Sequence, residues 1–340
     1  MTLVVMIHAS LKADDALNYY HLDFVQPYWI EIFKLFFAGI LANAAVPLFF
    51  LFSSYIQFSK NEKYTTLLKK RSKTVLLPYV IWTLITILLF FIAQSIPQTK
   101  DFFQNPDNQI RTWNFIDWIK AFTYKNFNEV LYYPFVYQFW FLRELMIFTI
   151  LSPILKFLCK KCTGLVIILI VAVNISGIPL FFTVSNSALF FYLLGYFFAE
   201  YKIDFFKLAD KIKFWEYGIL LFLTVFFTLA FDGKYNFKLV TIIISCLFFL
   251  KLSKMIVDNS HLWNIAKYLS GFSFFLYACH TPFLGTTINK LTMKYIPLHG
   301  INCLIQFLLA WTLTCFFGTF AGIILKKICP PLFRVLNGGR

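Results

Sequence analysis

Few side chains in this sequence can move a proton near neutral pH, and the first is His8, near the end of the short apolar run MTLVVMIHAS. An imidazole placed in an apolar segment can act as a general acid or base. The same placement is also typical of a histidine that packs at the level of lipid headgroups. Both interpretations stay open at this point.

The apolar run around His8 is short for a membrane helix. Ten residues rise only about 15 Å as a helix, roughly half of the hydrocarbon thickness of a bilayer. We therefore expect the first helix to begin upstream of Met1 and to be truncated at its N-terminal end in this sequence.

A charged pair lies in a second apolar run, QFWFLREL. Arg143 and Glu144 follow Trp140 by three and four residues, so the three share one side of a helix. Charged groups inside the membrane are expensive, which makes each of them a candidate for function. The pair could line a polar cavity, or it could be a structural ion pair that ties helices together.

A third set of polar residues follows one helical face. Ser273, Tyr277 and His280 are spaced i, i+4 and i+7, so they point into a helix bundle rather than into lipid. His280 could take part in chemistry or could form a hydrogen bond that packs helices. Asn43, Pro47 and Ser54 form a weaker stripe in an earlier run.

The composition is that of an integral membrane protein. Of the 340 residues, 59% are hydrophobic and only 14% are charged, compared with about 25% charged in soluble domains. The net charge of +15 resides in short loops between apolar runs, so we expect no nucleic-acid partner. Cys159 and Cys162 form a CxxC pair without a second pair or nearby histidines, so we expect no metal site.

The apolar runs predict an all-α, polytopic bundle in one domain over residues 1–340. We expect ten spans: 1–10, 31–58, 74–96, 135–156, 164–182, 186–201, 214–231, 236–252, 266–288 and 301–327. Alternate loops hold 20 Lys or Arg on one side and 9 on the other, which predicts that both termini are cytoplasmic. This orientation places His8, Arg143 and His280 in the outer half of the membrane, where one polar cavity would explain all three.

The longest connection, 97–134, falls on the outer side. Within it Phe115, Ile116, Ile119 and Phe122 follow helical spacing, which predicts a helix at the interface beside Trp113. It could be a lid or an acceptor platform, or an ordinary loop resting on the headgroups.

A basic segment, Lys69 to Lys73, lies at the cytoplasmic mouth of the third span and includes Lys70 and Arg71. Its ordinary role is to set topology. Such a cluster can also bind the phosphates of a cytoplasmic donor.

Five segments together resemble the membrane-bound acyltransferase-3 family of bacterial sugar O-acyltransferases: VVMIHAS, AVPLFFLFSSYIQF, KKRSKTVLLPYVIW, FWFLRELMIFTILSPI and SGFSFFLYACHTPFL. They occur in the family's order over about the whole chain. His8 matches the family's catalytic histidine, and Arg71 and Lys73 match its basic pair, with lysine where arginine is frequent. Ser54 stands where glycine is common, and the family's arginine before the histidine would precede Met1.

The resemblance implies a multi-pass protein of the bacterial cytoplasmic (inner) membrane. It implies an acyl-CoA donor, usually acetyl-CoA, bound by Lys70, Arg71 and Lys73, with no tightly bound cofactor. The acceptor would be a hydroxyl of a cell-envelope sugar or lipid-linked glycan. The polar groups within the spans, independently of the resemblance, predict the residues that line its cavity in the membrane lipid: Trp140, Glu144, Ser54, Ser273 and Tyr277.

The expected chemistry is acyl transfer. Neutral His8 would remove the hydroxyl proton during attack on the thioester, and Arg143 or His280 would stabilise the oxyanion or hold the acceptor. Direct transfer and an acyl-histidine intermediate both stay open. Two alternatives remain: a transporter or flippase for a polysaccharide intermediate, and an inactive relative whose first helix lacks its cytoplasmic half.

Overall fold

The computed structural model of the chain describes residues 1–10, 25–60, 62–97, 109–127, 131–181, 184–231 and 238–339. Helices dominate these ranges, as the apolar runs predict. Two compact units are present, and each is built from two stretches of chain. Unit 1 comprises Met1–Ser59 and Leu194–Ile324, and unit 2 comprises Lys60–Leu193 and Leu325–Arg340.

Unit 1 carries both histidines of interest. Its elements are α1 (Thr2–Ala9), α3 (Tyr28–Lys34), the π-helical η1 (Leu35–Leu41), η2 (Ala42–Ala44), α4 (Ala45–Ser59), α12 (Phe205–Asp210), α13 (Phe214–Ala230), α14 (Lys238–Asp258), α15 (Ser260–Ser270), α16 (Ser273–Cys279), the π-helical η8 (His280–Leu284), α17 (Gly285–Tyr295) and most of α18 (Asn302–Ile328). The helix α11 (Asn186–Glu200) begins in unit 2 and ends in unit 1.

Unit 2 carries the charged pair and the basic segment. Its elements are α5 (Tyr64–Arg71), the π-helical η3 (Ser72–Leu76), α6 (Leu77–Ser95), η6 (Ile110–Thr112), α8 (Phe115–Ala121), the antiparallel strands β1 (Asn126–Phe127) and β2 (Tyr132–Tyr133), η7 (Tyr137–Phe139), α9 (Trp140–Lys161), α10 (Thr163–Ser176) and α19 (Pro330–Leu336). In the long connection 97–134, residues 98–108 and 128–130 lie outside the described ranges.

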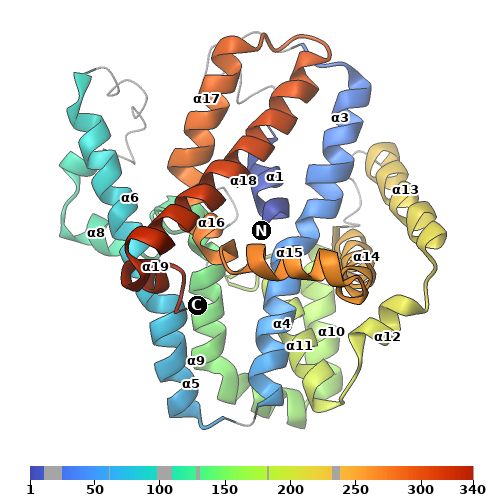
Figure 1. The fold of residues 1–340 in the computed structure, drawn as a ribbon. Coiled ribbons are helices and arrows are strands. Elements are labelled where there is room, and N and C mark those ends of the chain that lie inside the picture. Colours follow the sequence, from blue (N-terminus) through green and yellow to red (C-terminus); the bar gives the residue numbers. More distant parts are fainter. Residues whose placement is uncertain are drawn as a thin grey trace. The chain divides into compact units, whose positions relative to one another are not determined.

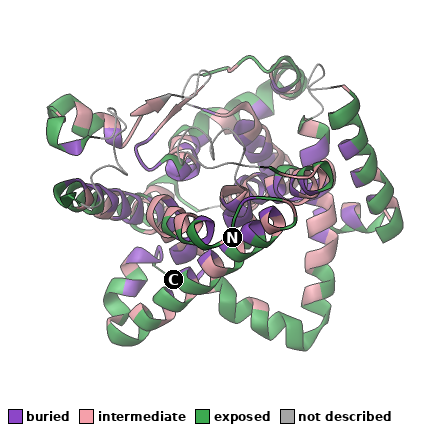
Figure 2. Cartoon of the chain, turned by 90° about the horizontal axis from the view of Figure 1, so that it is seen from above, coloured by how far each residue is buried: buried purple, intermediate pink, exposed green. Residues whose placement is uncertain are grey.

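Four helical stretches in the described ranges are long and apolar enough to cross a membrane: Tyr28–Ser59, Tyr64–Ser95, Lys238–Asp258 and Asn302–Ile328. Exposed apolar residues line their outward sides, while buried residues gather where helices face one another (Figure 2). This pattern is that of a helical membrane protein, because lipid rather than water covers such surfaces. The count of ten spans and the cytoplasmic placement of the termini stay predictions.

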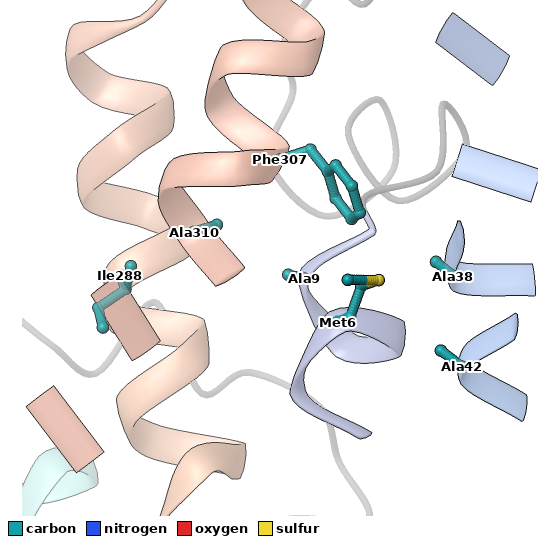
Figure 3. Packing of buried hydrophobic residues seen from close by; sticks show 7 residues of the cluster. All are labelled: Met6, Ala9, Ala38, Ala42, Ile288, Phe307 and Ala310. Atoms are coloured by element: carbon teal, nitrogen blue, oxygen red, sulfur yellow. The ribbon is translucent and has the colours of Figure 1, made fainter. Parts of the chain in front are cut away.

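The first helix, α1, is packed inside unit 1. In Figure 1 it lies beside α18, and the indole Nε1 of Trp311 on α18 donates a hydrogen bond of 2.8 Å to the carbonyl of Thr2. Figure 3 shows Met6 and Ala9 of α1 between neighbours on two sides. The buried cluster consists of Met6, Ala9, Ala38, Ala42, Ile288, Phe307 and Ala310. Small residues at four of these seven positions let the backbones approach closely.

Small residues also bring α18 against α16. A Cβ atom added at Gly318 would lie 2.5 Å from Leu276 Cδ1, and one at Gly322 would lie 3.1 Å from Phe275 Cδ1. The two glycines are four residues apart, so they face the same neighbour, as in the small-xxx-small pattern of membrane helix pairs. This packing supports the segment that ends in His280.

Candidate active site

The structure brings His8 and His280 together. His8 lies one residue before the end of α1, and His280 begins η8 where α16 ends. Their ring centroids are 5.3 Å apart, and the ring planes are inclined by 37°. Residues separated by more than 270 positions therefore form a histidine pair, within a single unit.

A local break in the helix positions His280. Thr281 has φ −142° and ψ 156°, which is extended rather than helical. Pro282 follows it, and the residue before a proline favours the extended region because the proline ring crowds the helical one. The chain resumes its helix at Gly285, where an added Cβ atom would lie only 2.7 Å from the His280 carbonyl oxygen. The sequence HTPFLG thus explains both the break and the close return of the chain.

The hydrogen bonding of His280 assigns its tautomer. Nδ1 lies 2.7 Å from the carbonyl oxygen of Tyr277. A carbonyl oxygen can only accept, so Nδ1 carries the hydrogen in the neutral ring and Nε2 carries a lone pair. His280 is 1% exposed, and its buried Nε2 has no hydrogen-bond partner among the described residues. An unpartnered buried acceptor is costly in a protein interior, and it is a suitable group to receive a proton from a substrate.

Three other residues that were predicted to line the cavity with His280 have separate contacts. Tyr277 is buried and supplies the carbonyl that holds His280. Ser273 donates a 2.7 Å hydrogen bond to the carbonyl of Ser270, at the start of α16. Ser54 is fully buried on α4, and its Oγ has no partner among the described residues.

Arg143 and Glu144 lie in unit 2, at the first turns of α9. Arg143 Nη1 donates to the carbonyl oxygens of Thr123, at 2.5 Å, and of Tyr132, at 2.9 Å. Its Nη2 lies 3.7 Å from Glu144 Oε1. The guanidinium therefore ties the segment around β2 to α9.

Glu144 is 1% exposed. One of its oxygens, Oε1, accepts from the Ser185 backbone N–H at 3.1 Å, while Oε2 has no partner among the described residues. Trp140, the first residue of α9, is half-buried on the same side of the helix. That these residues share a cavity with the histidine pair stays a prediction.

The basic segment spans the junction of α5 and η3. Lys69, Lys70 and Lys73 are exposed, and Arg71 is half-buried. Lys70 forms a surface ion pair with Glu62 at 3.0 Å. A pair of this kind contributes little stability, about 0–1 kcal/mol, so it leaves the lysine free to exchange partners.

A comparison with known protein families shows to which family the chain belongs. A family profile described as "Acyltransferase domain" matches residues 1–327, almost the whole chain. The chain belongs to the acyltransferase-3 family. Neither a search of curated proteins nor a search of solved structures finds a match.

Membership of the acyltransferase-3 family makes the protein a membrane acyltransferase, as the sequence motifs predict. All residues named above for the site fall within the matched range, whereas α19 lies beyond it. In the described parts of the chain, no cluster of three or more His, Cys, Asp or Glu could hold a metal ion.

Two buried polar residues in this acyltransferase-3 chain were not predicted from the sequence. Lys34 is 5% exposed, and its Nζ lies 5.7 Å from the centroid of the Phe307 ring. Gln306 is 1% exposed and donates from Nε2 to Asn289 Oδ1 at 3.1 Å. Lys34 could have been found from the sequence, because it lies inside the apolar run YWIEIFKLFF and a charge within a span marks a candidate for function.

Proposed function

We propose that this protein transfers an acyl group, acetyl in the simplest case, from cytoplasmic acyl-CoA to a hydroxyl of a cell-envelope or exported polysaccharide or glycolipid. The family supports acyl transfer in general. The donor, the acceptor and the acetyl group follow from the basic segment, the outer polar groups and the resemblance to sugar O-acyltransferases.

The observation that carries the proposal is the histidine pair. Two imidazoles with ring centroids 5.3 Å apart, one of them presenting an unpartnered Nε2 lone pair, form a proton-accepting site inside an apolar bundle. A sugar hydroxyl is a poor nucleophile unless a base removes its proton during attack. Within α1 itself, His8 is the one base, because the other residues from Leu3 to Ala9 are apolar.

In the proposed step the sugar hydroxyl attacks the thioester carbon of the donor. His8 takes the hydroxyl proton while the hydroxyl oxygen forms a bond to the thioester carbon, and the carbon–sulfur bond then breaks. The departing thiolate of CoA recovers the proton from the imidazolium. His280 Nε2 accepts a hydrogen bond from the hydroxyl or from His8. Two adjacent imidazolium ions would repel each other, so the pair holds one extra proton at a time.

The neutral tautomer of His280 argues against the stabilisation of an oxyanion by this residue. With Nδ1–H donated to Tyr277, neutral His280 has no N–H left for an oxyanion. We therefore assign His280 to proton acceptance rather than to oxyanion stabilisation. Arg143 is kept as a candidate for the oxyanion, although its contacts with Thr123 and Tyr132 also fit the positioning of the outer segment.

The proposed location is the bacterial inner membrane, with ten spans and both termini in the cytoplasm. The excess of Lys and Arg in alternate loops supports this orientation, which puts the segment from Lys69 to Lys73 on the side where acyl-CoA is found. Lys70, Arg71 and Lys73 would then contact the donor phosphates.

The test uses membranes that contain the wild type or His8→Ala at matched abundance. Radiolabelled acetyl-CoA is supplied, and label entering envelope polysaccharide is counted. Incorporation by the wild type and its loss in the variant support the proposal. Equal incorporation by both removes His8 from the mechanism, and movement of glycan without thioester consumption favours a transporter.

A further inference from the structure

The last helix of the chain, α19 (Pro330–Leu336), packs on α6 within unit 2 (Figure 1). Trp82 Nε1 on α6 donates a buried hydrogen bond of 2.9 Å to the Leu336 carbonyl. Phe333 and Leu336 are 3% and 5% exposed, so the apolar face of α19 is covered. The helix is thus a docked part of the unit, although it lies outside the residues that match the family.

The turn after α19 lies against Thr74, the residue that directly follows the basic segment. Gly339 N donates to the Arg334 carbonyl at 2.7 Å. A Cβ atom at Gly339 would lie 3.5 Å from Thr74 Cγ2, and Thr74 Oγ1 donates to the Lys70 carbonyl at 3.0 Å. Gly339 has φ +79°, a conformation that glycine adopts without strain. These contacts place the turn after α19 beside the residues that precede α6, with the Arg334 carbonyl one hydrogen bond away from that contact.

The charges gathered there are almost all positive. Residues 62–74 and 325–339 together hold eight Lys or Arg and a single carboxylate, Glu62. Arg334 and Lys73 are both exposed. Holding like charges together raises the free energy of the folded unit, and a multivalent anion relieves this cost. Arginine is suited to phosphate because its planar fork can donate two parallel hydrogen bonds.

We propose that Arg334 belongs to the same anion-binding surface as Arg71 and Lys73, and that this surface binds the phosphates of the acyl-CoA donor. The proposal rests on the proposed function. It adds a donor-binding residue from a helix that the family match does not include. In this proposal the docking of α19 on α6 serves to hold Arg334 near the basic segment. The same chemistry could also bind the phosphate of a lipid headgroup, so the test separates the two sources.

The experiment uses the whole 340-residue chain in two kinds of nanodisc: zwitterionic phosphatidylcholine alone, which carries no net charge, and phosphatidylcholine mixed with anionic phosphatidylglycerol. Binding of CoA and of 3′-dephospho-CoA is measured for the wild type, Arg334→Ala and Arg334→Lys. The control is Lys267→Ala, because Lys267 is an exposed lysine on α15 in the other unit. Thermal unfolding of each variant shows whether α19 stays docked.

The expected result is a rise in the Kd for CoA of about tenfold in Arg334→Ala, the usual scale for one charge-assisted contact. Arg334→Lys should show a smaller rise, the control none, and higher salt should narrow the differences. If the 3′-phosphate is the group bound, the effect of Arg334→Ala shrinks with 3′-dephospho-CoA; if the pyrophosphate is bound, the effect is equal for both ligands. Either result supports the proposal.

Three results overturn it. An unchanged Kd in Arg334→Ala removes Arg334 from the donor surface. A Kd that changes only in nanodiscs containing anionic phosphatidylglycerol assigns the surface to lipid instead of the donor. A wild type that binds no CoA overturns the proposed function together with this inference, whereas wild-type binding with an insensitive Arg334→Ala overturns the inference alone.

Discussion

Gly285 offers a way to displace His280 without touching either histidine. A Cβ atom at this position would lie 2.7 Å from the His280 carbonyl oxygen, which is a backbone atom and cannot swing aside. Reaching an ordinary contact of 3.4 Å requires the backbone to move by about 0.7 Å, and a misplacement of about 1 Å can reduce the rate of an enzyme roughly 100-fold. We expect Gly285→Ala to reduce acyl transfer about tenfold.

The effect on stability should be modest by comparison. Overpacking costs about 1–3 kcal/mol, and replacing a helical glycine by alanine returns about 0.5–1 kcal/mol. The net loss of about 0–2 kcal/mol corresponds to a fall in the unfolding temperature of a few degrees. Most of the variant should therefore be folded at the assay temperature, so lost activity would report on geometry.

Gly218 on α13 is the matched control, since a Cβ atom there would meet nothing within 4 Å. Gly218→Ala should keep wild-type transfer and unfold at the same or a slightly higher temperature. Both variants are assayed for label transfer from acetyl-CoA and for thermal unfolding. Wild-type transfer by Gly285→Ala, or a loss that merely follows the amount of folded protein, would refute the reasoning that places His280 in the site.

Three further variants test the packing and the electrostatics. Gly195→Ala should destabilise the protein by about 1–3 kcal/mol, measured by thermal unfolding, because the new Cβ would clash with the Leu51 carbonyl oxygen of α4. The Lys125 ammonium, 2.7 Å away, lowers the pKa of the Asp117 carboxyl. The protection of α8 against hydrogen exchange, measured relative to the intrinsic rate at each pH, should therefore hold down to about pH 4 and fall below it, with a smaller change in Lys125→Met. Trp82→Phe removes the hydrogen bond to Leu336 and should speed hydrogen exchange in α19 while changing overall stability by only about 1 kcal/mol.

The length of the apolar runs predicted most of the helices, but the residues at which they end are set by local backbone conformation. The expected span 31–58 corresponds to Tyr28–Ser59. The expected span 164–182 corresponds to a helix that stops at Ser176, because Gly177 takes φ +71° and closes it. The expected span 266–288 is divided in the structure, since residues up to Ser270 belong to the exposed helix α15 and a new helix begins at Ser273. Hydropathy alone does not register such breaks.

The histidine pair was partly predictable. Positive-inside counting put His8 and His280 at a similar depth, which suggested a shared site. Their contact depends on the close packing of α18 on α16 through Gly318 and Gly322, and no local pattern specifies that pairing. The tautomer of His280 depends on the Tyr277 carbonyl, which became visible only with the backbone in place.

Other features of the site lay beyond sequence reasoning. The contacts of Arg143 with Thr123 and Tyr132 join segments whose relative position comes from tertiary folding. The approach of Gly339 to Thr74 depends on a turn at the end of the chain and on a tryptophan about 250 residues earlier. Charge patterning predicted topology there, but it could not predict which basic residues would meet.

The most direct test of the histidine pair is a double-mutant cycle in acyl transfer from radiolabelled acetyl-CoA, with His8→Ala, His280→Ala and the combined variant at matched abundance. If the two imidazoles act as one proton-accepting unit, each single variant should lose about 100- to 10,000-fold, and the double variant little more. Near-normal transfer by either single variant, or losses that multiply in the double variant, would contradict a shared catalytic role.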